Sequence, residues 1–108
     1  MASDKQALAV KISPTAERDL KRIWRYNAES RTERHADDYM AFLTKEIFKL
    51  SSNYNRGKIL QVDPSLRFIV MKRRAGGEGH IAIYQIVESA VKVLHVFHTR
   101  QDWQSEYE

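Results

Sequence analysis

The pattern of hydrophobic and polar positions is clearest over residues 80–97, where two runs of β-branched and aromatic residues flank a polar break at residues 88–89. Such a pair of runs is typical of a β-hairpin. Apolar side chains occupy both faces of the first run, with Ile81 and Ile83 on one side and Tyr84 on the other. We therefore expect this hairpin to form the centre of a sheet, with neighbouring strands and a covering layer.

Two further segments have strand character. Residues 8–12 alternate, with Leu8, Val10 and Ile12 facing one way, and residues 66–71 form a β-branched and aromatic run. The second run reaches the hairpin through a glycine-rich turn, so the last three strands form an antiparallel meander. Residues 51–64 contain turn formers without clear periodicity, which predicts a connecting loop.

Two amphipathic helices are predicted between the first two strands, near residues 14–27 and 32–51. Ser13 and Pro14 form a helix start, because serine caps a free N–H and proline lacks one. Ser30 or Thr32 is placed to cap the second helix, whose apolar residues recur at a spacing of three or four. The short link between the helices predicts an antiparallel helical hairpin that covers one face of the sheet.

These elements predict an α+β fold of order β-α-α-β-β-β, in which the helical hairpin packs on one face of a small four-stranded, mainly antiparallel sheet. The whole chain, residues 1–108, is expected to be one domain with its core at about residues 8–103. The predicted core consists of Leu20, Ile23, Trp24, Leu43, Ile47, Ile83, Val93 and Val96. The other face is expected to stay partly open, bordered by Arg67, Lys72, Arg73, Arg74, Tyr84, His98 and Arg100.

Composition narrows the classes of function. With 43% hydrophobic and 30% charged residues, the sequence indicates a soluble globular protein. No apolar run approaches the ~18 residues of a membrane span, and residues 1–6 lack a signal-peptide pattern, so we expect a cytoplasmic protein without membrane contact. The absence of cysteine and of HxxxH spacing argues against a metal site, and we expect no cofactor. A net charge of +4 favours a polyanion or an acidic protein as partner.

Five segments, in order, resemble a known family. Residues 12–26, ISPTAERDLKRIWRY, resemble the "spxAexDLxxIwxY" opening of the ParE/RelE toxin superfamily. Residues 55–57 are similar to its "P-x-x-G" loop without the proline, and residues 66–67 to its "lR" strand. Residues 83–86 resemble its "I-x-Y-x-v" strand, and residues 93–102 its closing "v-x-v-l-x-v-x-H-x-R-x-D". The resemblance spans about residues 10–102.

This resemblance implies a toxin of a bacterial type II toxin–antitoxin, or plasmid stabilisation, module, neutralised by an acidic cognate antitoxin in a hetero-oligomer. RelE-like members cut messenger RNA on the ribosome, whereas ParE-like members inhibit DNA gyrase. The opening and closing segments are more ParE-like, which favours gyrase as the target. The alternatives are a RelE-like ribosome-dependent endoribonuclease and a non-toxic scaffold that only binds the antitoxin, so the sequence leaves open whether the chain is an enzyme.

Gyrase binding and RNA cleavage have different candidate residues. For gyrase binding, the candidates lie where the last strand leaves the sheet: His98, Arg100, Asp102 and Trp103. For RNA cleavage, proton transfer and charge stabilisation would fall to Arg67, Arg73, Tyr84, His98 and Arg100, although no paired base and acid is evident. Tyr84 also fits a half-buried strand position, and Arg100 with Asp102 fits a local ion pair.

Overall fold

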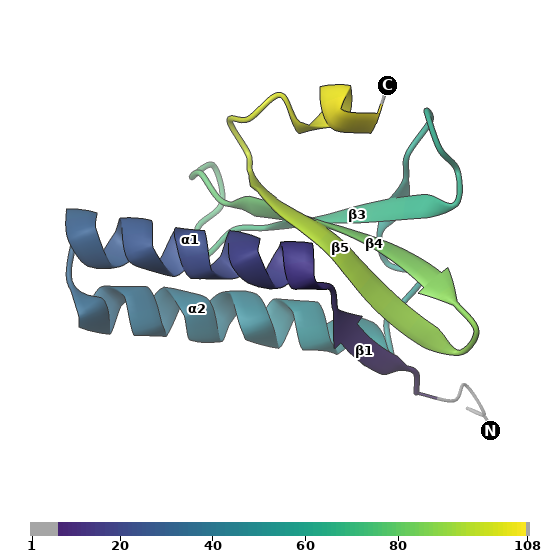
Figure 1. The fold of residues 1–108 in the computed structure, drawn as a ribbon, viewed down its shortest axis with the longest axis horizontal. Helices are drawn as coiled ribbons and strands as arrows, with labels where there is room; N and C mark the ends of the chain where they lie inside the picture. Colours follow the sequence, from purple (N-terminus) through teal and green to yellow (C-terminus); the bar gives the residue numbers. More distant parts are fainter. Residues whose placement is uncertain (1–6, 108) are drawn as a thin grey trace.

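The computed structural model describes residues 7–107, and residues 1–6, for which no signal peptide is expected, lie outside this range. Its α-helices and strands follow one another in the predicted order, with one additional strand (Figure 1). The elements are β1 (Ala9–Ile12), α1 (Pro14–Ser30), α2 (Glu33–Phe48), the 3₁₀ helix η1 (Lys49–Ser51), β2 (Lys58–Ile59), β3 (Leu66–Met71), β4 (His80–Val87), β5 (Ala90–His98) and the 3₁₀ helix η2 (Trp103–Tyr107). Within residues 7–107, no helix has both the length and the apolar character needed to cross a membrane.

The sheet has five strands, in the order β1-β5-β4-β3-β2, so the prediction of four strands is wrong. The additional strand, β2, pairs antiparallel with β3 inside the segment predicted as a loop. It is only two residues long and both side chains are exposed, so it leaves no alternating pattern to detect. β1 pairs in parallel with β5, whereas the other three pairs are antiparallel, so the sheet is mainly antiparallel as expected.

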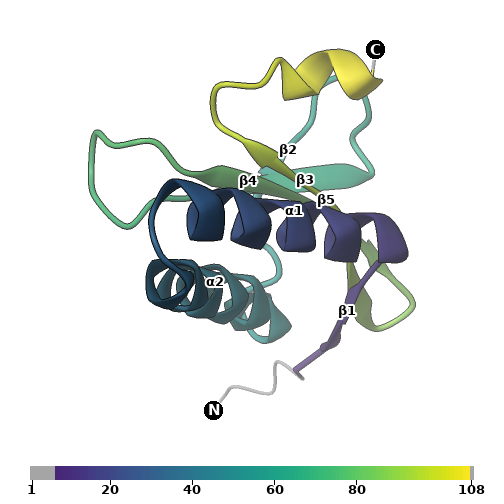
Figure 2. The same cartoon turned by 60° about the vertical axis from the view of Figure 1, so that its left-hand side comes forward.

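The helical hairpin forms as the capping signals predict. Ser13 caps α1 by accepting a hydrogen bond from the Ala16 amide, with Pro14 in the first turn. Thr32, rather than Ser30, caps α2 by accepting from the His35 amide. Figures 1 and 2 show the two helices side by side on one face of the sheet, with η2 on the opposite side.

The helices and the sheet enclose the larger core, which contains most of the predicted residues. Leu43, Ile47, Val93 and Val96 are buried there, and Leu20 and Ile23 pack against it from α1. Val93 and Val96 share a face although they are three apart, because the register shift between β4 and β5 leaves Leu94 as an extra residue on β5.

Two predicted core residues lie elsewhere. Ile83 is buried on the opposite face of the sheet, since strict alternation along β4 places it on the other side from Tyr84. Trp24 is half-buried, and its indole Nε1 donates to Asp37 on α2 at 2.8 Å. The sequence therefore predicted the helix phase correctly but not the side of β4 that faces the helices.

The face predicted to stay partly open carries a second, smaller core. Trp103 from η2 packs at a tilt against Phe68 of β3 and stacks on Phe97 of β5, with ring centroids 5.0 Å and 6.5 Å apart. Leu60, Leu66, Ile81 and Ile83 complete this cluster. The C-terminal segment thus covers part of the face that the sequence pattern left without a covering layer.

Candidate functional site

A tight turn at the end of β5 orients the side chains that leave the sheet. The Gln101 amide donates to the His98 carbonyl at 2.9 Å, and the His98 amide donates to Gln101 Oε1 at 2.8 Å. The Arg100 amide donates to His98 Nδ1 at 3.0 Å, so this nitrogen acts as an acceptor. The other ring nitrogen, Nε2, then faces Glu78 at 3.5 Å.

The loop between β3 and β4 is attached to this turn. The Gly79 amide donates to Thr99 Oγ1 at 3.2 Å, and the Thr99 amide donates to the Gly79 carbonyl at 3.0 Å. The Arg100 guanidinium forms an ion pair with Glu78, rather than with Asp102. A side chain at position 79 would collide with the Met71 carbonyl, so glycine is required for this approach. The loop that carries Arg73 and Arg74 is therefore held beside the β5 exit.

A row of three rings links α2 to the β5 exit. The Tyr39 hydroxyl lies 2.6 Å from His80 Nδ1, and the rings of His80 and His98 meet edge to face with centroids 5.1 Å apart. Burial lowers the pKa of His80 to about 4, and the neighbouring His98 acts in the same direction. Burial raises the pKa of Tyr39 to about 12, against the opposing effect of Arg73. At neutral pH the buried imidazole is therefore uncharged and the phenol keeps its proton.

These groups line an open groove of about 1340 Å³ between α1, α2, the β3–β4 loop and the β5 exit. Five arginines line it: Arg22, Arg31, Arg73, Arg74 and Arg100. The loop that carries two of them projects beyond the sheet in Figure 2. The groove combines imidazole, phenol and guanidinium groups, which bind phosphate oxygens and transfer protons. In residues 7–107, no cluster of three or more potential metal ligands is present.

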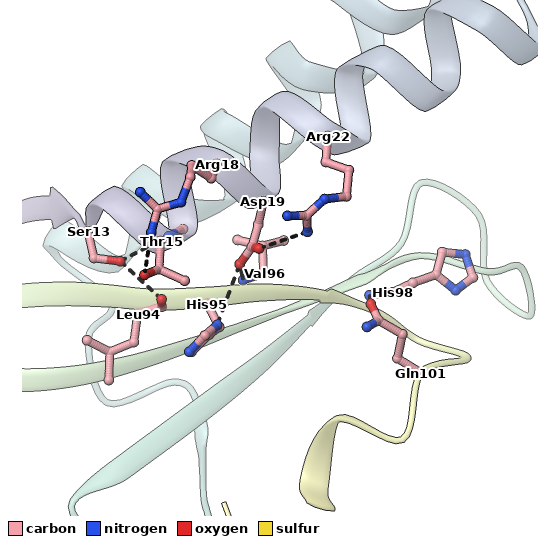
Figure 3. A network of polar contacts seen from close by, with 11 residues as sticks. Ser13, Thr15, Arg18, Asp19, Arg22, Leu94, His95, Val96, His98 and Gln101 are labelled. Atoms are coloured by element: carbon pink, nitrogen blue, oxygen red, sulfur yellow. Dashed lines mark hydrogen bonds and ion pairs between the residues drawn. The ribbon is translucent and has the colours of Figure 1, made fainter. Parts of the chain in front are cut away.

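One wall of the groove depends on Asp19, which the sequence analysis did not identify. Its buried carboxylate accepts from the Val96 amide at 2.9 Å and lies 3.6 Å from His95 Nδ1 and 3.3 Å from Arg22 Nη1. Figure 3 shows Asp19 of α1 and Ser13, the N-cap of this helix, reaching to the edge of β5, where Ser13 donates to the Leu94 carbonyl. β1 pairs with β5 only as far as Val93, so these two side chains replace a strand partner beyond that point.

Two residues of the predicted ribonuclease set, Arg67 and Tyr84, do not line the groove. Tyr84 is fully buried on the helix side, where its hydroxyl accepts from the Gly57 amide at 2.9 Å and donates to the Tyr54 carbonyl at 2.7 Å. Burial raises the pKa of Tyr84. Arg67, its cross-strand neighbour, donates to the carbonyls of Asn55 and Gly57. The expectation that Tyr84 borders an open face is wrong, because the loop before β2 closes over it.

The residues predicted to bind a target protein are also separated by the structure. His98 is half-exposed, and Arg100 and Asp102 are exposed. Trp103, in contrast, is only 8% exposed and belongs to the smaller core. It cannot serve as an exposed aromatic anchor for a partner, because its ring is already packed against Phe68.

The groove therefore gathers His98, Arg73 and Arg100 from the predicted set and adds groups that sequence reasoning missed. Tyr39 and His80 are 41 positions apart, and no local pattern signals their contact. Arg22 is an exposed residue of α1, and its helical position alone gives no sign of the groove beside it.

Comparison with known proteins agrees with this fold. Residues 10–103 match the family described as the ParE toxin of type II toxin–antitoxin system, parDE. A solved structure described as the chromosomal ParDE TA system from P. aeruginosa is similar, with a TM-score of 0.72 and 15% identity over 85% of this chain and 96% of that chain. A double mutant of the E. coli toxin RelE in the free state has a TM-score of 0.56 and 19% identity over 94% of each chain. No curated protein sequence matches the chain. The resemblance to the ParE/RelE superfamily is thereby confirmed.

Proposed function

The chain belongs to the ParE toxin family of type II toxin–antitoxin systems, and we propose that it acts by binding and inhibiting DNA gyrase. It does so without hydrolysing a substrate itself. Membership of the family implies a cognate antitoxin as partner. We propose that this antitoxin is acidic, because the chain carries a net charge of +4 and opposite charge accelerates association.

The burial of Tyr84 is the observation that supports binding over RNA cleavage on the sheet face. Both hydrogen-bonding functions of its hydroxyl are occupied by backbone groups, and its side chain has no exposed surface. A general base or acid must reach the proton that it transfers, directly or through one water. Tyr84 and its neighbour Arg67 instead stabilise the loop at residues 54–57.

The proposed contact surface for gyrase is the β5 exit. Arg100 and Asp102 are exposed there, and His98 presents part of its ring beside them. The turn hydrogen bonds hold this group in one arrangement, which lowers the entropy lost on binding. Trp103 anchors the segment after this surface to the sheet, because its ring packs against Phe68.

A supercoiling assay with purified gyrase tests this proposal. We expect the wild-type chain to inhibit supercoiling and Arg100→Ala to inhibit at least about tenfold less well, as loss of a central arginine contact costs about 2 kcal/mol. Lys92→Ala is the matched control, because Lys92 is an exposed cation on β5, the strand that ends just before Arg100, and lies outside the groove lining. Unaffected supercoiling by the wild-type chain would contradict the proposal, as would equal effects of the two variants.

A second candidate function, ribosome-dependent cleavage of messenger RNA, is favoured by one observation. The groove places the imidazoles of His80 and His98 next to each other among five arginines, so it combines groups that can transfer protons with cations that can stabilise phosphate charge. A parallel assay with translating ribosomes distinguishes the two functions. Messenger cleavage that is abolished by His98→Ala would support this candidate, whereas a chain active in neither assay would be a binding scaffold.

A further inference from the structure

The arginines of the groove come from three separate parts of the chain. Arg22 and Arg31 lie on and just after α1, Arg73 and Arg74 lie in the β3–β4 loop, and Arg100 follows β5. Local sequence does not bring these groups together, because the three segments are far apart along the chain. The contacts of Gly79 with Thr99 and of Glu78 with Arg100 hold the loop against the β5 exit.

The groove carries most of the net charge of the protein. Its lining contains five arginines against two carboxylates, Asp19 and Glu78, an excess of three positive charges beside a net charge of +4 for the whole chain. The two carboxylates pair with Arg22 and Arg100. Among residues 7–107, no carboxylate lies within ion-pair distance of Arg31, Arg73 or Arg74.

The cations of the groove are all of one kind. The sequence contains ten arginines and eight lysines, yet half of the arginines and none of the lysines line the groove among the described residues. A guanidinium donates two parallel hydrogen bonds to a phosphate, whereas an ammonium acts as a point charge. Arg73 also lies over the ring of Phe42, 5.9 Å from its centroid, which limits the motion of its side chain.

Aromatic groups lie along the same groove. Tyr26 is 70% exposed, and no hydrogen bond from its hydroxyl is present in the described part of the chain. His35 and His98 contribute partly exposed rings. Basic grooves with exposed rings are typical of single-stranded nucleic acid sites, in which cations follow the phosphates and bases stack on the rings.

We propose that this arginine groove binds a strand of DNA, with phosphates on Arg31, Arg73 and Arg74 and an unpaired base on Tyr26. This inference rests on the proposed function for the choice of DNA, since gyrase is an enzyme that works on DNA. An acidic peptide would also be attracted by the charge. Nucleic acid is favoured because the groove offers an exposed tyrosine for stacking and, among the described residues, only Ile23 and Val96 as aliphatic lining residues.

Fluorescence anisotropy of a labelled single-stranded DNA, titrated with the full chain, measures the binding. Three phosphate contacts predict that log K falls with log salt with a slope of about −2, which corresponds to about 20-fold weaker binding between about 50 and about 200 mM salt. The combined variant Arg31→Ala, Arg73→Ala and Arg74→Ala should lose most of this slope. Tyr26→Ala should weaken binding about tenfold or more while leaving the slope unchanged.

A second triple variant controls for net charge. Arg25, Lys45 and Lys92 are exposed and lie outside the groove lining, so replacing all three with alanine removes the same charge from other surfaces. We expect this variant to keep at least about a third of the wild-type affinity at about 100 mM salt. Replacing the three groove arginines with lysine should retain the salt slope and thereby show that the slope depends on positive charge at these positions, while circular dichroism of the alanine variant shows whether it is folded.

Several outcomes would overturn the inference. It fails if the two triple-alanine variants bind DNA equally, or if RNA of the same sequence binds about tenfold or more tightly and is cut. It also fails if the triple-alanine variant of the groove loses its affinity for an acidic peptide such as poly-glutamate but keeps its affinity for DNA. A chain that inhibits gyrase but does not bind DNA would leave the proposed function intact, whereas groove-dependent DNA binding without gyrase inhibition would support the groove and contradict the proposed target.

Discussion

Two polar clusters on β4 use similar residues in opposite ways. At Tyr84, a tyrosine that is closed off from solvent and a half-buried arginine, Arg67, bind backbone groups of residues 54–57. At His80, a histidine contacts the side chains of Tyr39 and His98, beside a groove that opens to solvent. By residue type alone, both clusters suit proton transfer and phosphate binding. Their partners and their access to solvent distinguish a structural cluster from a candidate site.

The difference between the two clusters follows from the hydrogen-bonding groups that each one contacts. The Tyr84 hydroxyl accepts from the buried Gly57 amide and donates to the Tyr54 carbonyl, so its hydrogen bonds support the fold. The His80 imidazole contacts the side chains of Tyr39 and His98, and among residues 7–107 no carboxylate lies within ion-pair distance of the neighbouring Arg73 and Arg74. Groups of this second kind remain available to a ligand.

The largest expected effect is a loss of stability on substitution in the closed core, which a substitution in the groove should not produce. Leu43→Ala should lower the free energy of unfolding by about 2–5 kcal/mol, because Leu43 is fully buried and the substitution leaves a cavity. Tyr26→Ala, in the groove, should change it by less than about 0.5 kcal/mol, since Tyr26 is 70% exposed. Urea unfolding measures both. A loss below half a kcal/mol for Leu43→Ala, or a large loss for Tyr26→Ala, would contradict the division into closed and open regions.

A smaller difference in stability is expected between substitutions of Tyr84, in the closed cluster, and Tyr39, beside the groove. Tyr84→Phe should destabilise the protein by about 2–4 kcal/mol, because it leaves the buried Gly57 amide and the Tyr54 carbonyl without this hydroxyl. Tyr39→Phe is the matched control and should cost about 1 kcal/mol or less, since water can reach the half-exposed edge of its cluster. Equal losses in thermal or urea unfolding would mean that Tyr84 is no more structural than Tyr39.

The smallest of the three effects is a pH dependence that originates at His80. Its pKa is about 4 in the folded protein and 6.5 in the unfolded chain, so the unfolded state binds the proton first as the pH falls. The stabilisation is complete above about pH 6.5 and is lost progressively towards pH 4, by an amount on the order of 2 kcal/mol.

Urea unfolding at several pH values, with His80→Asn as the comparison, tests this dependence. Titrating carboxylates affect both proteins alike, and the asparagine keeps a hydrogen-bonding group near Tyr39. The wild type should therefore lose more stability than the variant between pH 6.5 and pH 4. Parallel stability curves would show that His80 is not buried in its neutral form.

Local patterns predicted most of the elements but not the assignment of faces. The caps at Ser13 and Thr32, the helix phase at Leu43 and the three long strands are all present as expected. β2 was missed because two exposed residues have no periodicity. The site predictions were least accurate at Tyr84 and Trp103, whose side chains are buried under segments that are remote in the sequence.

The sequence by itself determined the order of elements, the basic charge and the resemblance to the ParE/RelE superfamily, because capping, periodicity and composition are properties of neighbouring residues. Only the tertiary structure decided which polar residues are available for function. The loop before β2 covers Tyr84, η2 fills the face around Phe68, and the β3–β4 loop carries Arg73 to the β5 exit. Each of these contacts joins segments far apart in the chain, so burial and charge convergence depend on packing that no local pattern encodes.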